Sequence, residues 1–155
     1  MFEGRLFASA YVGRLSTLML LLAALACATP PVRAQAPAAG EPPEAACADK
    51  TSNVETTQCL GEFAAKVDRD LNALWPRVLA SIDGASHLTK AQRADWKAKL
   101  TAAQRHWIAF KTADCREPVG YEWFGGTGMS GAVSTCLAKH TVDRMQDLKA
   151  RYLGR

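Results

Sequence analysis

Four cysteines in the C-terminal two-thirds of the chain place the strongest constraint on its fold. Cys47, Cys59, Cys115 and Cys136 form an even set, separated by the stretches 48–58, 60–114 and 116–135. The set contains no C-x-x-C pair, and the three histidines are not paired at zinc-ligand spacing, so we expect two disulfides and no metal site. The spacing leaves three pairings open, although Cys47 with Cys59 and Cys115 with Cys136 would each close a short loop.

The segment 1–34 of the 155-residue chain predicts an export signal. It contains Arg5 and Arg14, followed by an uncharged apolar run at 15–26 that is too short to span a bilayer. Cleavage after Ala34 would release a protein without a transmembrane span into the periplasm or the medium, where disulfides form. The less favoured alternative is a lipoprotein anchored through Cys27, because alanine stands three positions earlier, where lipoprotein signals prefer a large aliphatic residue.

The net charge of the chain argues against a nucleic-acid partner. The whole sequence carries +4, but the segment 1–34 holds three arginines and one glutamate, so the exported part carries only +2. Proteins that bind nucleic acid need a strongly basic stripe to neutralise phosphates. We therefore expect no nucleic-acid binding.

Composition and hydrophobic periodicity divide the exported part into a tether and a helical domain over 47–155. Residues 35–46 are mainly Pro, Ala and Glu without periodic apolar positions, which predicts a flexible segment. Ser52 and Glu55 have the spacing of a capping box, which predicts that a helix begins near residue 53 and ends near 83. The apolar positions of that helix advance by three or four residues: Phe63, Val67, Leu71, Leu74, Val78 and Ile82.

Two further helices complete the prediction of an all-α fold. Pro76 should kink or break the first helix near Trp75. A second helix from about Lys90 to Cys115 would form an antiparallel hairpin with the first, and a third is predicted over 130–152 after a glycine-rich loop at 119–131. The second helix carries Trp96, Leu100, Ala103, Trp107, Ile108 and Lys111 along it. This order of helices returns all four cysteines to one end of the bundle.

Five polar residues on the predicted helices have two interpretations: Asp68, Asn72, Gln104, Arg105 and Arg144. Carboxylate, amide and guanidinium groups on facing helices could form an active site. The favoured interpretation is a structural network, because buried polar groups usually satisfy one another and fix how helices pack. No nucleophile with an adjacent base is recognisable, so we expect neither an enzyme nor a cofactor.

The loop before the third helix holds the candidate partner-binding residues: Tyr121, Glu122, Trp123 and Phe124. Aromatic side chains beside glycines are frequent anchors at protein interfaces. The alternative is that the rings fold back over the cysteines, and the sequence favours it because small domains tend to use their large side chains in the core.

An ordered set of short motifs covers residues 47–153. The motifs are Cys47 and Cys59 around a polar helix start, Asp68-x-x-Leu71-Asn72-x-x-Trp75, Leu100-x-x-x-Gln104-Arg105-x-Trp107-Ile108, Asp114-Cys115, Gly125-Gly126-Thr127, and Cys136-x-x-x-x-Thr141-x-x-Arg144-x-x-x-Leu148. This set resembles the LprI-like lysozyme inhibitor family of small exported bacterial proteins. Trp75 and Lys111 depart from the family pattern, because they stand where tyrosine and arginine are commoner.

The resemblance implies a helical fold and, through the family's named representative, inhibition of lysozyme. We therefore expect an exported binding protein with a protein partner, as a lysozyme inhibitor or a related factor that protects the cell envelope. The alternative is a structural or stress-related envelope module that binds no lysozyme. Animal-type lysozymes are usually strongly basic, so a net positive charge on the exported part gives no long-range attraction to them. Glu117 and Glu122 are local exceptions to this positive charge, because they place acidic groups near the loop.

Overall fold

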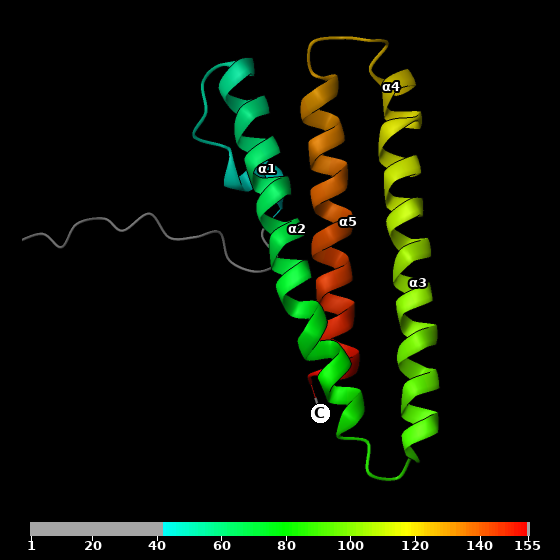
Figure 1. The fold of residues 1–155 in the computed structure, drawn as a ribbon. Helices are drawn as coiled ribbons and strands as arrows, with labels where there is room; N and C mark the ends of the chain where they lie inside the picture. Colours follow the sequence, from blue (N-terminus) through cyan, green and yellow to red (C-terminus); the bar gives the residue numbers. More distant parts are fainter. Residues whose placement is uncertain (1–41, 155) are drawn as a thin grey trace, which may run out of the picture. The chain divides into compact units, whose positions relative to one another are not determined.

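The computed structural model describes residues 42–154 as an all-helical unit, as the sequence predicts. Its elements are α1 (Pro43–Ala46), α2 (Asn53–Asp83), α3 (Lys90–Arg116), α4 (Pro118–Glu122) and α5 (Met129–Tyr152), which Figure 1 shows. The predicted export signal at 1–34, Cys27 and most of the predicted tether at 35–46 lie outside the described residues. Within 42–154, no helix combines the length and the apolar character needed to cross a bilayer.

The capping box predicted at the start of α2 is present. Ser52 Oγ accepts a hydrogen bond from the Glu55 amide at 3.2 Å, and the Glu55 carboxylate accepts one from the Ser52 amide, also at 3.2 Å. The hydrogen bonds from the Ser52 hydroxyl and amide lower the pKa of Glu55. The stabilisation from this ionised cap is therefore complete above the ordinary glutamate pKa and is lost as the pH falls through the lowered value.

Pro76 lies inside α2 without ending it, so the predicted break near Trp75 does not occur. A proline in a helix interior costs about 3 kcal/mol, because a backbone donor is lost and the ring clashes with the preceding turn. The turn that follows carries Val78 and Ile82, both almost completely buried. Burial of each such side chain contributes roughly 1.5–3 kcal/mol, which is enough to keep the helix intact beyond the proline.

The core lies between α2 and α5, which run side by side in the same direction in Figure 1. Its buried apolar side chains include Phe63, Val67, Leu71, Leu74, Val78 and Ile82 of α2, and Ala138, Val142, Met145, Leu148 and Tyr152 of α5. α3 runs antiparallel to α2, as predicted, but contacts this pair less extensively. On α3, the polar Gln104 is buried, whereas Ala103 and Ile108 are exposed.

Two short helices lie where the sequence predicts no regular structure. α1 begins at Pro43, so ordered structure starts before Cys47. A proline in the first turn fixes φ without losing an intrahelical hydrogen bond, and the side chain of Pro43 is also buried. α4 occupies the start of the predicted loop at 119–131 and uses Pro118 in the same way.

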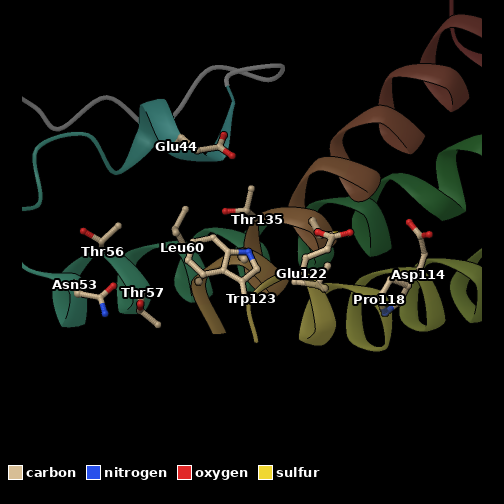
Figure 2. A pocket seen from close by; sticks show the side chains of 14 residues that line it. Glu44, Asn53, Thr56, Thr57, Leu60, Asp114, Pro118, Glu122, Trp123 and Thr135 are labelled. Carbon is tan, nitrogen blue, oxygen red and sulfur yellow. The ribbon is translucent and has the colours of Figure 1, made fainter. Parts of the chain in front are cut away.

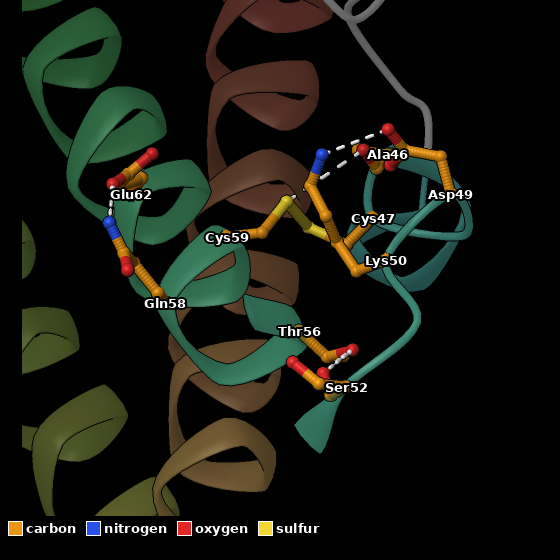
Figure 3. Close-up of a disulfide and its surroundings, with 9 residues drawn as sticks. All are labelled: Ala46, Cys47, Asp49, Lys50, Ser52, Thr56, Gln58, Cys59 and Glu62. Carbon is orange, nitrogen blue, oxygen red and sulfur yellow. Dashed lines mark hydrogen bonds and ion pairs between the residues drawn. A yellow bond between two sulfur atoms is a disulfide. The ribbon is translucent and has the colours of Figure 1, made fainter. Parts of the chain in front are cut away.

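Two disulfides join the ends of the helices, in the pairing that closes the shorter loops. The Cys47–Cys59 bond, drawn in Figure 3, ties the segment after α1 to the second turn of α2. The Cys115–Cys136 bond ties the end of α3 to α5. Because α2 and α5 begin at the end of the bundle where α3 stops, both bonds lie at that end, as predicted. We call it the disulfide pole.

Removal of the second bridge should destabilise the fold without changing its helices. Replacing both Cys115 and Cys136 by Ala frees a segment with a sequence separation of 21 residues. The free energy of unfolding should fall by about 3 kcal/mol, because the unfolded chain gains loop entropy. Urea denaturation measures the change, and wild-type protein treated with a reductant should show at least a similar loss. An unchanged unfolding midpoint in the double variant would contradict the assigned role of this bond.

Candidate partner-binding site at the disulfide pole

Two exposed aromatic rings stand at the disulfide pole. Tyr121 is 83% exposed, Phe124 is 96% exposed, and Trp123 is half-exposed at 47%. The sequence-favoured alternative, in which these rings cover the cysteines, is therefore wrong for Tyr121 and Phe124. We call residues 121–128 the aromatic turn. Contiguous exposed aromatic side chains of this kind are unusual on a monomer surface and are typical of contact sites.

The backbone of the aromatic turn holds Phe124 in an uncommon conformation. Its φ is +47°, in the left-handed region, and Gly125 follows with a φ of +70°. The Gly126 amide donates to the Trp123 carbonyl at 2.7 Å, and the Met129 amide donates to the Gly126 carbonyl at 3.0 Å. A bulky residue rarely adopts a positive φ, and such strained positions often lie at functional sites. The hydrogen bonds fix the turn so that the Phe124 ring remains outside.

The Trp123 indole lies against Gly128. Any other residue type at position 128 would displace the ring. A Cβ atom built on Gly128 would lie 2.3 Å from Cζ3 of the Trp123 indole, far inside van der Waals contact. The turn is further connected to the start of α2 by a long hydrogen bond of 3.5 Å from Asn53 Nδ2 to the Thr127 carbonyl. Gly128 therefore sets the position of the indole.

A groove of about 520 Å³ lies beside Trp123. Figure 2 shows it between the segment that holds α1, the first turns of α2, α4 and the start of α5. Its lining combines apolar, hydroxyl and carboxylate side chains and includes Leu60, Val119, Trp123, Asn53, Thr56, Thr57, Thr135, Glu44, Asp114 and Glu122. No lysine or arginine is among the described residues that line it. The groove therefore has an apolar floor and an acidic rim.

Asp114 connects the groove to the second disulfide. Its carboxylate lies 2.9 Å from His140 Nε2, and the His140 ring packs edge-on against Phe110 with the ring centroids 5.5 Å apart. Asp114, Cys115, Cys136 and His140 offer potential ligand atoms within 4.8 Å of one another. The two sulfurs are bonded to each other, however, so the set lacks the thiolates by which cysteine binds zinc.

The predicted polar network forms in part, away from the groove. Arg144 Nε donates to Gln104 Oε1 at 2.9 Å, and Asn72 Nδ2 donates to Asp68 Oδ2 at 3.4 Å. Arg105 is exposed and makes no side-chain hydrogen bond or ion pair within residues 42–154. Since Asp68 lies eight positions beyond Leu60, roughly 12 Å along α2, this network and the groove are separate features.

Lys111 is the member of the network that the sequence did not identify. Its buried Nζ donates to Asp68 Oδ1 and to Thr141 Oγ1, both at 3.1 Å, and so joins α3 to α2 and α5. Two cations lie over the Trp107 ring in cation–π contacts. Lys111 Nζ is 5.0 Å from the ring centroid, and the Arg144 guanidinium carbon is 5.7 Å from it. The sequence placed Lys111 in the second helix, but the partners of a buried amine depend on residues 30 and 43 positions away.

A double-mutant cycle can test how much the hydrogen bond between Lys111 and Thr141 contributes to the packing of α3. Thr141→Val removes the hydroxyl that accepts a hydrogen bond from Lys111 and donates one to the Leu137 carbonyl. The free energy of unfolding should fall by about 1–2 kcal/mol, because a buried ammonium loses a partner. In a Lys111→Met background the same change should cost about 1 kcal/mol less, since no ammonium remains. Equal costs in the two backgrounds, measured by urea denaturation, would show that the contact contributes nothing.

The position of Trp123 can be tested through the glycine beneath it. Gly128→Ala should displace the indole from the groove, because the new Cβ would overlap the ring, whereas the helices should stay intact. Acrylamide quenching of tryptophan fluorescence should increase, and circular dichroism should be unchanged. Gly120→Ala is a matched control, because a Cβ there would meet the Met129 sulfur at an ordinary 3.8 Å. Equal quenching in the two variants would disprove the packing of Trp123 on Gly128.

Comparisons with known proteins identify the family of the chain. The family described as lysozyme inhibitor LprI matches residues 47–148, a range that holds both disulfides, the aromatic turn and the polar network. An uncharacterized protein of Rhizobium meliloti (strain 1021) is 30% identical over 131 residues, which cover 83% of this chain and 89% of the relative. No solved structure shows a significant match to the chain. The chain belongs to the LprI lysozyme inhibitor family, which is a family of inhibitors and not of enzymes.

Proposed function

We propose that this protein is an exported inhibitor that binds lysozyme through the aromatic turn at the disulfide pole. One observation carries the proposal: in a chain of an inhibitor family, Tyr121 and Phe124 are almost fully exposed beside two disulfides. Aromatic side chains bury much area with few rotatable bonds, so they supply most of the affinity at many interfaces. The turn is the part of the described surface that best fits this role.

The rigidity of the pole favours inhibition by occupation of a cleft. A protrusion that is already ordered loses little entropy when it binds, and therefore keeps more of its contact energy as affinity. Here the Cys115–Cys136 bond closes the segment that contains the turn, and two backbone hydrogen bonds fix its shape. Such an element would block a substrate cleft without being turned over.

The proposed location follows from the segment 1–34 and the disulfides. We propose that this segment is an export signal and that the mature protein acts in the periplasm or the medium, with residues 35–46 before the domain. Both bonds need an oxidising compartment, which supports this assignment. Lipid attachment at Cys27 is the alternative, and the mass of the exported form distinguishes the two. Either form would meet lysozyme outside the cytoplasm.

Inhibition assays with a matched control test the proposal. The exported protein should inhibit lysis of bacterial cell walls by at least one of several lysozyme types. Tyr121→Ala with Phe124→Ala should weaken binding about 100-fold or more, because each hot-spot ring contributes at least about 2 kcal/mol. Phe110→Ala, which truncates a ring that is 55% exposed on α3, should have little effect.

The outcomes separate the candidate functions. Loss of inhibition with unchanged helicity, measured by circular dichroism, supports the aromatic turn as the binding element. Inhibition that survives the Tyr121 and Phe124 changes but is lost in Phe110→Ala would move the site to α3. Lack of inhibition by wild-type protein at micromolar excess against every lysozyme tested would reject the proposal in favour of an envelope module.

A further inference from the structure

We infer that the groove beside Trp123 binds a basic side chain of the partner protein, and specifically an arginine. The inference rests on the proposed function, since it names the chemistry that the partner must present next to the aromatic turn. Three features of the groove support it: the sign of its charge, two carboxylates that have no partner within residues 42–154, and an aromatic wall.

The charge of the groove differs from that of the chain as a whole. Three carboxylates, those of Glu44, Asp114 and Glu122, line the groove, and no lysine or arginine does so among the described residues. They come from α1, α3 and α4: the Cys47–Cys59 bond ties the segment after α1 to α2, and the Cys115–Cys136 bond ties the end of α3, just before α4, to α5. An acidic groove attracts a cation locally, although the exported part of the chain carries a net charge of +2.

Two of these carboxylates have no partner among the described residues. Within residues 42–154, the side chains of Glu44 and Glu122 take part in no hydrogen bond or ion pair, whereas Asp114 contacts His140 at 2.9 Å. Figure 2 shows Glu44 and Glu122 around the same groove as the Trp123 indole. Carboxylates accept charge-assisted hydrogen bonds that are roughly twice as strong as neutral ones. A cation that enters the groove can therefore meet a carboxylate that has no other partner among the described residues.

The remaining walls favour arginine over lysine. The half-exposed indole of Trp123 offers a face on which a planar guanidinium can stack, and Leu60 and Val119 offer an apolar floor for the methylene stem. A guanidinium is less strongly hydrated than an ammonium and binds carboxylates through two parallel hydrogen bonds. The groove, at about 520 Å³, also has the size of a ligand pocket, so residues that flank the arginine can enter with it.

A small-molecule titration tests the groove without lysozyme. Nα-acetyl-arginine amide, added to the exported protein, should shift the Trp123 indole NMR signal in a saturable way, with millimolar affinity. The citrulline derivative has the same shape without the charge and should cause no comparable shift. Glu44→Gln with Glu122→Gln should weaken arginine binding about tenfold. Asp95→Asn with Asp143→Asn, which removes two exposed carboxylates outside the groove, should leave it unchanged.

Three results would overturn the assignment. Equal shifts with the arginine and citrulline derivatives would show that charge does not matter in the groove. Unchanged arginine affinity in the double Gln variant would show that Glu44 and Glu122 do not bind the cation. Shifts with an N-acetylglucosamine oligomer and none with arginine amide would mark the groove as a glycan site.

Lysozyme binding by the same variants separates this inference from the proposed function. The double Gln variant should bind a basic lysozyme about tenfold more weakly, and its affinity should depend less on salt. If wild-type and Gln variants bind lysozyme equally, the groove assignment fails and the proposed function stands. If wild-type protein binds no lysozyme but still binds arginine amide in a charge-dependent way, the proposed function fails and the groove assignment stands.

Discussion

The bond between Cys115 and Cys136 is the constraint on which the arrangement of α3 and the aromatic turn depends. α2 and α5 share a continuous apolar core, to which α3 adds Leu100 and the partly buried Trp96 and Trp107, and α3 also buries two polar side chains, Gln104 and Lys111. Apolar burial therefore holds α3 less strongly than it holds α2 and α5, and the bond fixes one end of α3 against α5. The same bond encloses α4 and the aromatic turn in a covalent loop, so it limits how far the exposed rings can move. The positions of α3 and of the exposed rings thus depend on the same bond.

Sequence patterns predicted the long helices well, because each pattern there is local. The stripe from Phe63 to Ile82 and the capping box at Ser52 involve residues within one or two turns of each other, and both are present. The break at Pro76 was wrong because tertiary burial outweighed a local penalty. α1 was missed since its short sequence, PEAA, carries no apolar period, and its position depends on contacts with α2 and α5 beside the Cys47–Cys59 bond. Local sequence patterns fail to predict a helix or its bounds where contacts between distant residues determine them.

The sequence predicted several residues of the candidate site, but not how the structure arranges and exposes them. The sequence identified the aromatic residues and Glu122, but favoured burial of the rings, and nothing local indicates that Phe124 adopts a φ of +47°. Glu44 had no signal at all, because its role depends on the disulfide that brings α1 to the groove. The sequence placed Lys111 in the second helix, whereas its burial and its hydrogen bonds to α2 and α5 required the helices to be placed.

In the proposed function, stability and binding are supplied by different parts of the described residues. The aromatic turn adds little to the core, since Tyr121 and Phe124 bury almost none of their area, and the left-handed backbone at Phe124 costs on the order of 1–2 kcal/mol. A turn that strains the backbone while leaving its rings in water does not help the chain to fold. Its physical advantage lies in a complex, where a partner covers the rings and their burial becomes favourable. The same reasoning applies to Glu44 and Glu122, whose carboxylates gain a charged partner only when a cation enters the groove.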